Sequence, residues 1–321
     1  MIDAIFQALE KELLGVQKNV LLAPYSNFKI GGPAGYFFNA NTKEDVLKAV
    51  AVSQQLGIAV FVLGGGTNLI FADEGFLGLV VKIGKLGEVV VEGETISAGA
   101  GVGMDEMVTV SIKHSLKGLE WAGGLPGTFG GAIRGNAGAF GGEIKDTVMQ
   151  VEALAENMQP RIFNNSECGF SYRSSIFKEK NWVILSASVR LQPGNATELQ
   201  AIADSRVAYR RKNHPLEYPS AGSVFKNVDV KKILPEFLKQ FVDKIKQDPF
   251  PIVPAAWFII GAGLTGTQIG QAQISTKHSN YIINLGGAKA QDVLGLIDLV
   301  KNKVKERYNI ELEVEVQYVA N

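Results

Sequence analysis

The amino-acid sequence predicts a mixed α+β protein built from more than one domain. The chain has 321 residues, which is long for one hydrophobic core and typical of two or three domains. Helical patterns alternate along it with short apolar runs that are typical of buried strands. A third observation is a stretch over residues 118–142, in which ten of 25 residues are glycine.

The composition is that of a soluble globular protein, with 46% apolar and 20% charged residues. Lys plus Arg and Asp plus Glu number 32 each, so no net charge favours nucleic acid or an anionic membrane as a partner. The single cysteine, Cys168, excludes an internal disulfide bond and fits a reducing compartment. The longest apolar run, residues 252–264, is too short to span a membrane. We therefore expect a cytoplasmic protein.

Local signals place the regular elements along the chain. Thr42 and Asp45 form a capping box that starts a helix, and Gly57 follows its end. Alternation of acidic and apolar residues from Glu311 predicts a half-buried strand at the end of the chain. The expected helices cover residues 2–14, 43–55, 103–117, 196–211, 229–246 and 290–306. The expected strands cover residues 36–39, 58–63, 78–83, 88–92, 95–98, 148–155, 182–191, 281–284 and 311–319.

A glycine loop directly follows the predicted strand 58–63. Its sequence is Gly64-Gly65-Gly66-Thr67-Asn68-Leu69. Several free backbone N–H groups in one concave loop can bind phosphate oxygens. The loop lacks the G-x-G-x-x-G spacing of the Rossmann fingerprint, and no helical pattern follows it. On this loop alone, a phosphate nest and an ordinary tight turn are both open.

The stretch 118–142 favours irregular backbone, because each glycine costs conformational entropy without adding a side-chain contact. Such a cost is accepted where the backbone turns at positive φ or approaches a flat or phosphorylated ligand. The alternative is a flexible linker, but Leu119, Trp121 and Phe129 are too apolar for a solvated tether. Pro126, Thr128, Asn136 and their neighbours contain no set of metal ligands, so we expect no metal here.

Three polar residues stand out in apolar surroundings, and each also has a purely structural interpretation. Arg173 follows Tyr172 between two predicted strands and could be a structural ion-pair partner. Ser223 lies among Pro, Ala and Gly and could be an ordinary turn serine; no G-x-S-x-G motif indicates a hydrolase. Glu315 belongs to the alternating strand and could lie on a solvated acidic face.

Taken together, these segments resemble the UDP-N-acetylenolpyruvoylglucosamine reductases over nearly the whole chain. Many motifs in the same order carry the resemblance, whereas one alone would be weak. They are NFKIGGPA (27–34), LGGGTNLIF (63–71), GLEWAGGLPGTFGGAIRGNAGAFGGEI (118–144), YRSSIFK (172–178), PSAGSVFKN (219–227), AGLTG (262–266), ISTKHSNYIIN (274–284) and LEVEV (312–316).

The resemblance implies a fold and its division. It implies an FAD-binding domain of the vanillyl-alcohol-oxidase type in two α+β subdomains, followed by a C-terminal α+β substrate-binding domain. We expect subdomain 1 over residues 1–83, joined by the strand 310–319, subdomain 2 over 84–205 and the substrate domain over 206–309. The overall length is similar to that of the shorter family subtype, which lacks an extra tyrosine-bearing loop.

The resemblance also implies an activity. It implies noncovalent FAD and NADPH as cosubstrate in the reduction of UDP-N-acetylglucosamine enolpyruvate to UDP-N-acetylmuramate, for peptidoglycan precursors in the bacterial cytoplasm. A monomer is expected. Two alternatives are a flavin-dependent alcohol or sugar oxidase or dehydrogenase of the same wider fold, and a flavin-binding protein without reductase activity. Against the first, neither glycine loop contains the His or Cys that often attaches flavin covalently.

By motif position, the resemblance assigns roles to individual residues. Arg173 would stabilise the negative charge that develops on the substrate, Ser223 would donate a proton to carbon, and a protonated Glu315 would donate a hydrogen bond. The implied cofactor-binding residues are Gly64, Gly65, Gly66, Thr67, Asn68, Leu69, Pro126, Gly127, Thr128, Gly131, Asn136 and Ala137. The implied substrate-binding residues are Tyr172, Lys212, Asn227 and His278.

The sequence departs from the family pattern near the substrate side. Family members commonly have Lys-Gln-Pro before the Pro-Ser-Ala-Gly-Ser motif, whereas Asn213, His214 and Pro215 are found here. Lys212 or Arg211 could then supply the basic contact to the substrate diphosphate. The stretch 228–256 is also unusual.

Overall fold

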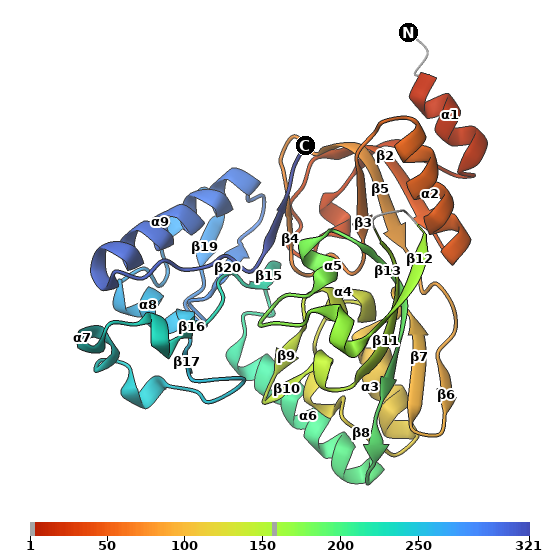
Figure 1. Cartoon of the computed structure of the whole chain (residues 1–321). Helices are drawn as coiled ribbons and strands as arrows, with labels where there is room; N and C mark the ends of the chain where they lie inside the picture. The colour runs from red at the N-terminus through yellow and green to blue at the C-terminus, as the bar shows by residue number, and fades with distance from the viewer. Residues whose placement is uncertain (1–3, 156–158) are drawn as a thin grey trace.

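The computed structural model describes residues 4–155 and 159–321. The chain forms three groups of elements, each containing one main sheet, which lie next to one another in Figure 1. The first helix begins at Ala4. Residues 2 and 3 of the predicted helix 2–14 therefore lie outside the described residues.

The N-terminal group contains a four-stranded sheet with the order β1-β2-β5-β3. Strands β1 and β2 are antiparallel, whereas β5 is parallel to both β2 and β3. Helix α2 packs on this sheet, and its predicted capping box of Thr42 and Asp45 is present. The elements are α1 (Ala4–Glu12), β1 (Gln17–Leu21), β2 (Pro33–Ala40), α2 (Lys43–Gln55), β3 (Val60–Leu63), β4 (Leu69–Phe71) and β5 (Phe76–Ile83).

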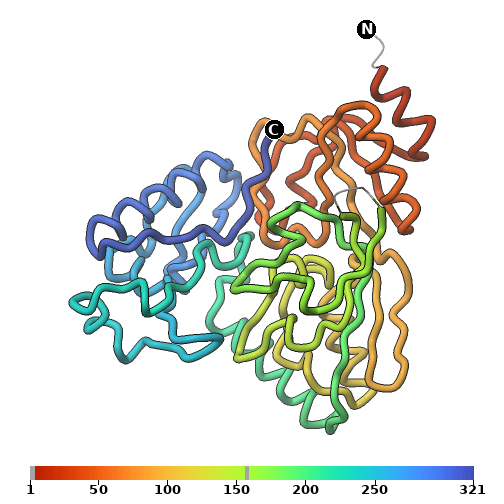
Figure 2. Tube along the Cα trace, in the orientation of Figure 1, coloured from red at the N-terminus to blue at the C-terminus, as the bar shows by residue number. Residues whose placement is uncertain are grey.

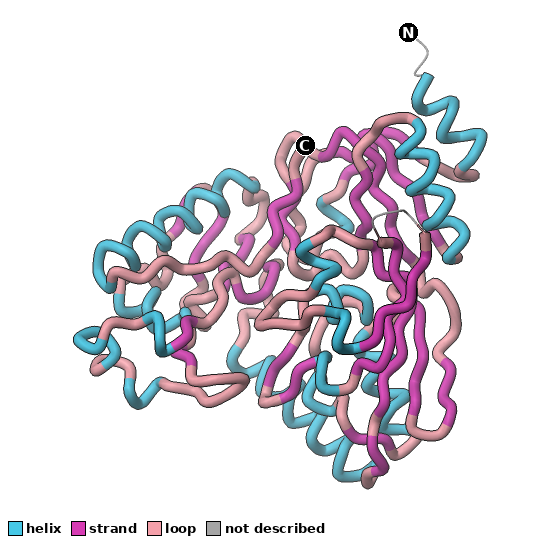
Figure 3. The backbone as a smooth tube through the Cα atoms, in the orientation of Figure 1, coloured by secondary structure: helices cyan, strands magenta, loops and turns pink. Residues whose placement is uncertain are grey.

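The second group contains an antiparallel sheet with the order β12-β11-β13-β7-β6. Helix α4 packs on β13 and β7, and α3 lies between α4 and α6. Figure 3 shows these helices beside the magenta strands. The elements are β6 (Val90–Glu92), β7 (Thr95–Gly99), α3 (Met104–Lys113), β8 (Leu116–Lys117), α4 (Phe129–Arg134), β9 (Gly138–Ala139), β10 (Gly142–Glu143), β11 (Val148–Leu154), β12 (Pro160–Asn164), α5 (Ile176–Glu179), β13 (Val183–Arg190), β14 (Gln192–Pro193) and α6 (Ala196–Asn213).

The glycine-rich stretch 118–142 is more regular than the sequence predicts, because it contains the helix α4 and the β9–β10 pair. Thr128 begins α4, and its hydroxyl accepts a hydrogen bond from the Gly131 N–H at 3.3 Å. A Cβ atom on Gly130 would lie 2.6 Å from the Ala100 Cβ. The glycine therefore lets α4 approach the end of β7 closely.

The C-terminal group contains an antiparallel sheet with the order β15-β20-β19-β18, on which α9 packs. The predicted helix 229–246 is wrong. Pro235 has no N–H to continue a helix, so it begins a new short one, and buried Ile233 and Phe241 hold the segment irregularly. The elements are β15 (Ser220–Ser223), β16 (Val228–Asp229), α7 (Pro235–Leu238), β17 (Ile252–Val253), α8 (Ala255–Gly261), β18 (Gln268–Ile269), β19 (Ala272–Ile274), β20 (Tyr281–Asn284), α9 (Ala290–Tyr308) and β21 (Gln317–Val319). Single 3₁₀ turns cover Ala23–Tyr25, Glu120–Ala122, Ile144–Asp146, Asn165–Cys168, Val230–Lys232 and Val242–Lys244.

The chain ends by returning to the N-terminal group. Strand β21 pairs in parallel with β4, and Figure 2 shows this final dark-blue segment lying beside the orange tube. The predicted strand 311–319 is therefore too long, because its first half crosses between groups and makes only the isolated bridge of Val314 with Phe225.

The buried side chains form one large cluster through the first two groups, from Leu9 to Ala203, and another that is mainly C-terminal. A smaller third cluster lies in the N-terminal group and includes Val319 of β21. The division at residues 83, 205 and 309 stays a prediction. Among the described residues, no helix is both long and apolar enough to cross a membrane. No group of three or more His, Cys, Asp or Glu side chains in the described part of the chain could hold a metal ion.

Candidate active site

A cavity of about 1640 Å³ lies where the three groups of elements meet. Both glycine loops line it, together with residues of the Arg173 turn, β15, β20 and the C-terminal segment. A pocket for one drug-sized ligand is typically about 300–1,000 Å³. The volume is therefore sufficient for a large cofactor and a substrate together.

The two glycine loops touch each other along one wall of the cavity. A Cβ atom on Gly65 would lie 2.8 Å from the Gly127 Cα, and one on Gly64 would lie 2.7 Å from the Thr128 hydroxyl oxygen. Gly66 has φ +65°, and a Cβ there would lie 2.0 Å from the Tyr25 carbonyl oxygen. Side chains are thus excluded by close backbone approach, which leaves a wall rich in peptide groups.

The structure places most of the predicted cofactor-binding residues on this wall. Gly64 to Leu69, Pro126, Gly127, Thr128, Gly131 and Ala137 all line the cavity. Asn136 does not, because its side chain is fully buried in the protein. Its amide donates to the Ser171 carbonyl at 2.9 Å, and its oxygen accepts from the Lys145 N–H at 3.2 Å. Asn136 therefore holds neighbouring loops together.

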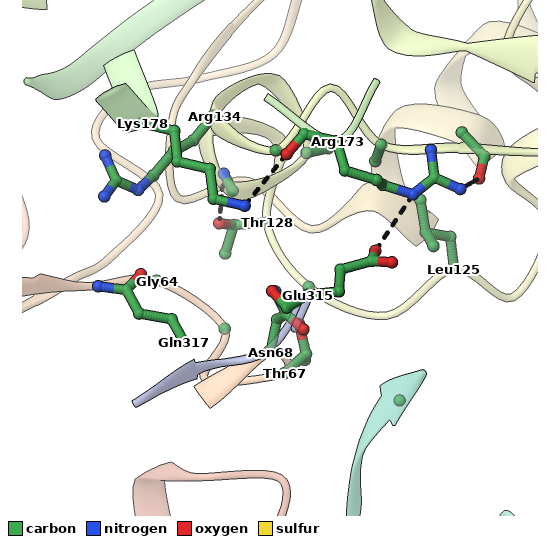
Figure 4. A pocket seen from close by; sticks show the side chains of 18 of the residues that line it. Gly64, Thr67, Asn68, Leu125, Thr128, Arg134, Arg173, Lys178, Glu315 and Gln317 are labelled. Carbon is green, nitrogen blue, oxygen red and sulfur yellow. Dashed lines mark hydrogen bonds and ion pairs between the residues drawn. The ribbon is translucent and has the colours of Figure 1, made fainter. Parts of the chain in front are cut away.

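Arg173 lies at the tip of a tight turn closed by two backbone hydrogen bonds between Ser171 and Ser174, each 3.1 Å. Its φ of +57° is left-handed, a conformation that side chains rarely adopt. The guanidinium Nη2 donates to the Gly138 carbonyl at 2.8 Å, and Nε lies 3.1 Å from the Glu315 carboxylate. Figure 4 shows the Arg173 and Glu315 side chains pointing toward each other.

Glu315 is held from both sides of the cavity. Its N–H donates to the Val224 carbonyl at 2.7 Å, and its carbonyl accepts from the Asn68 side chain at 3.1 Å. Burial raises the pKa of its carboxyl group, while the positive charges of Arg173 and Lys178 oppose that shift. The solvated acidic face considered from the sequence does not apply to Glu315, which is only one-fifth exposed.

Ser223 ends strand β15 and lines the cavity, whereas the nearby Ser220 is buried and does not. The pairing of β15 with β20 shifts register between these two serines. Gly222, with φ +80°, supplies the backbone conformation for this bulge. The Pro-Ala-Gly context of Ser223 therefore places this residue at the cavity.

Of the four predicted substrate-binding residues, three line the cavity and one does not. Tyr172, Asn227 and His278 line the cavity. Burial raises the pKa of Tyr172, and interactions with Arg173 and Asn227 oppose that shift. Lys212 does not line it but borders a separate surface hollow with Arg211. On helix α6, Lys212 lies about 200° around the axis from Arg210, which does face the cavity. The expected contact of Lys212 with the substrate diphosphate is therefore wrong, because the helix turns this side chain away from the cavity.

Sequence reasoning gave no site role to many polar residues that line the cavity, among them Lys178, His214, Lys246 and Tyr281. Lys178 lies in the YRSSIFK motif and donates to the Arg173 carbonyl at 3.1 Å. Tyr281 lies in the motif 274–284 and His214 at the departure from the family pattern, but the contact between them spans 67 positions. No local pattern indicates such a contact.

The residues of the cavity fit FAD. The glycines of this wall present backbone peptide groups, because close contacts leave no room for side chains there, and such a wall suits a diphosphate, which the loops 64–69 and 126–131 would hold. Apolar side chains, including Val60, Val62 and Trp182, line another part of the cavity and suit flat ring systems.

Comparisons with known proteins agree with this assignment. A family model described as an FAD binding domain matches residues 34–157, and the C-terminal domain of UDP-N-acetylenolpyruvoylglucosamine reductase matches residues 214–319. A reductase of that name from Caldanaerobacter subterraneus subsp. tengcongensis is 40% identical over 96% of each chain. One from Clostridium novyi is 37% identical over 97% of this chain and 94% of the relative. The crystal structure of the enzyme from Thermus caldophilus superposes with a TM-score of 0.74 at 29% identity, covering 94% of this chain and 98% of that one.

Fold and site thus define an FAD-containing oxidoreductase, as the sequence predicts. The match to the C-terminal domain of UDP-N-acetylenolpyruvoylglucosamine reductase, over residues 214–319, is more specific than the match to the FAD-binding domain. The chain belongs to the UDP-N-acetylenolpyruvoylglucosamine reductase family.

The close contact between the glycine loops makes flavin binding sensitive to a single methyl group. We expect Gly65→Ala to separate the loops and to lose most of the bound FAD. Gly35→Ala is the matched control, because a Cβ there would lie 2.5 Å from the Leu77 carbonyl oxygen, away from the cavity. This control should lower thermal stability but keep the flavin. Absorbance of the purified variants measures occupancy, and full flavin content in Gly65→Ala would contradict the assignment of this loop.

Proposed function

We propose that this protein is a cytoplasmic, monomeric enzyme that reduces UDP-N-acetylglucosamine enolpyruvate to UDP-N-acetylmuramate. The observation that carries the proposal is that Arg173, Ser223 and Glu315, from three distant segments, line the same cavity as both glycine loops. FAD supplies the redox chemistry in such an enzyme, with NADPH as its reductant. Subdomains over 1–83 and 84–205 would bind FAD, and residues 206–309 would bind substrate.

The charge of Arg173 suits a substrate that becomes more negative during the reaction. Addition of hydride to the β-carbon of an enol ether conjugated to a carboxylate leaves an enolate-like dianion. A guanidinium fixed by Gly138 and Glu315 can meet that charge without reorganising during the reaction. A Glu315 carboxyl that keeps its proton, as its raised pKa favours, can donate a hydrogen bond to the same group.

Ser223 is proposed as the donor of the proton to the neighbouring carbon. Serine is a weak acid in water, but a carbanion-like centre is strongly basic and the cavity wall limits access of solvent. The bulge at Gly222 brings Ser223 to the cavity. The interpretation of Ser223 as an ordinary turn serine does not explain why the bulge turns it toward the cavity and leaves Ser220 buried.

The purified protein tests the proposed reaction directly. We expect a flavin absorbance band, release of FAD on acid denaturation, and NADPH oxidation that depends on UDP-N-acetylglucosamine enolpyruvate. If O₂ supports NADPH oxidation at the same rate with and without this substrate, the result would contradict the proposal and favour an oxidase. Flavin without substrate-dependent turnover would favour a binding protein.

Separate half-reactions test the role of Ser223. Ser223→Ala should leave reduction of the flavin by NADPH almost intact, because that step needs no proton at the substrate carbon. Reoxidation by the enolpyruvyl substrate should slow by about 10²–10⁴-fold, the usual contribution of a positioned acid. Stopped-flow absorbance measures both steps, and Ser220→Ala is the matched control. Wild-type reoxidation in Ser223→Ala, or a selective defect in Ser220→Ala, contradicts the role.

We propose Lys246 as the basic contact to the substrate diphosphate, in place of Lys212. Lys246 comes from the unusual segment 228–256 and lines the cavity near His278, whose pKa its charge helps to lower. Two backbone hydrogen bonds with Ile252, of 2.9 and 2.8 Å, fix its position. Four other cations of the cavity, Arg134, Arg173, Lys178 and Arg210, donate to backbone carbonyls, and Lys145 pairs with Glu143. Asp248 also lines the cavity and would limit the excess positive charge.

Two matched substitutions distinguish these lysines. Lys246→Gln should raise the KM for the UDP substrate by about 10-fold with little change in kcat, because a charged contact equal in ground and transition states is lost. Lys212→Gln should leave both constants unchanged. Steady-state kinetics at saturating NADPH measures the difference. The reverse pattern, with a raised KM only in Lys212→Gln, would contradict the proposal.

A further inference from the structure

A chain of hydrogen-bonding groups leads away from Ser223 into the C-terminal group. Ser223 pairs directly with Tyr281 across strands β15 and β20, which puts their side chains next to each other. Both side chains line the cavity, and an interaction with the Ser223 hydroxyl lowers the pKa of Tyr281 against the larger effect of burial. The Tyr281 hydroxyl lies 3.1 Å from Nδ1 of His214. Three groups able to carry a proton are therefore in series.

The chain is held in place by packing. The Tyr281 side chain is buried, and the His214 ring lies against it with ring centres 5.2 Å apart. His214 caps the C-terminus of α6, where its N–H donates to the Arg210 carbonyl at 2.8 Å. The His278 ring packs edge-on against His214 and Tyr281, at 5.5 and 4.9 Å between ring centres. The hydroxyl and the imidazole nitrogen thus have little freedom to separate.

Both groups behind Ser223 are uncharged near neutral pH. Burial, with the nearby charges of His278, Arg210 and Lys277, lowers the pKa of His214 to about 4. Burial raises the pKa of Tyr281 above its ordinary value, although Arg210 opposes the shift. Burial also lowers the pKa of His278, which faces the pair. A neutral imidazole has one protonated and one free nitrogen, so it can give a proton and take one.

We propose that Tyr281 and His214 form a relay that returns a proton to Ser223 while Ser223 protonates the substrate carbon. This inference rests on the proposed reductase function and extends it to two positioning residues. The Ser223 O–H bond breaks as the new C–H bond forms, and the Tyr281 proton moves to the serine oxygen. The His214 proton moves from Nδ1 to the tyrosine oxygen, and the other ring nitrogen takes a proton from water. One solvent proton is consumed and no charged serine remains.

The relay removes a specific difficulty of serine as an acid. A serine that loses its proton without replacement would leave an alkoxide, which is far more basic than the tyrosine beside it. Concerted transfer through Tyr281 avoids this charge in a cavity that already holds the substrate carboxylate. Tyr281 and His214 act through Ser223 and need not touch the substrate.

The test compares Tyr281→Phe, Ser223→Ala and the double variant in the half-reaction in which substrate reoxidises the flavin. Tyr281→Phe keeps the ring and removes only the hydroxyl, and we expect a rate about 10- to 100-fold below wild type with normal flavin reduction by NADPH. Adding Tyr281→Phe to Ser223→Ala should cause no further loss, because residues that act as a unit are non-additive. Tyr308→Phe is the control, since Tyr308 is a buried tyrosine of the same group outside the cavity.

Solvent isotope effects provide a readout that a structural role would not change. Rates in mixtures of H₂O and D₂O should depend on deuterium content in a curved manner for wild type, as for several protons in motion, and linearly for Tyr281→Phe. A wild-type rate in Tyr281→Phe, additive losses in the double variant, or the same linear dependence in both proteins would overturn the relay. Substrate-dependent turnover by the wild-type enzyme tests the proposed function separately, so failure of the relay leaves that function standing.

Discussion

The return of the C-terminal segment to the N-terminal group is the constraint on which the site depends. Strand β21 pairs with β4, and the Gln317 N–H donates to the Asn68 carbonyl at 3.0 Å. Two residues earlier, Glu315 bonds Val224 of the opposite group. The glycine loop that includes Asn68 and the β15 strand that ends at Ser223 are thereby linked through one short segment. Glu315 is then held 3.1 Å from Arg173, which comes from the second group.

The pair of Arg173 and Glu315 lies in the cavity, where it suits a catalytic role better than a stabilising one. Taking a carboxylate and a guanidinium out of water costs free energy that their attraction often only offsets. Burial indeed raises the pKa of Glu315 in spite of Arg173. The pair also requires Arg173 at a left-handed φ, which is a further cost. Such costs are typical of positions that a reaction requires.

Local signals in the sequence predicted those helix ends and strands that neighbouring residues along the chain determine. The capping box at Thr42 matches the structure because it depends on local contacts, and the short strand 281–284 matches because its run of apolar residues is buried in the sheet. The resemblance located Arg173, Ser223 and Glu315, and the structure brings them to one cavity. Features that depend on the rest of the fold could not be predicted from local patterns. These are the face of α6 on which Lys212 lies and the irregular segment around Pro235. The contact of Tyr281 with His214, 67 positions apart, is another.

The most direct test of the account is the rate at which the enolpyruvyl substrate reoxidises the reduced flavin of the Arg173→Lys variant. Lysine keeps the positive charge but lacks the guanidinium group, whose separate nitrogens contact Gly138 and Glu315 at the same time. The account predicts a reoxidation rate about 10²–10³-fold below wild type, with flavin content and reduction by NADPH retained. Arg161→Lys, at an exposed ion pair with Glu167, should show no such loss. Near-wild-type reoxidation in Arg173→Lys would contradict the account and leave Arg173 with a structural role alone.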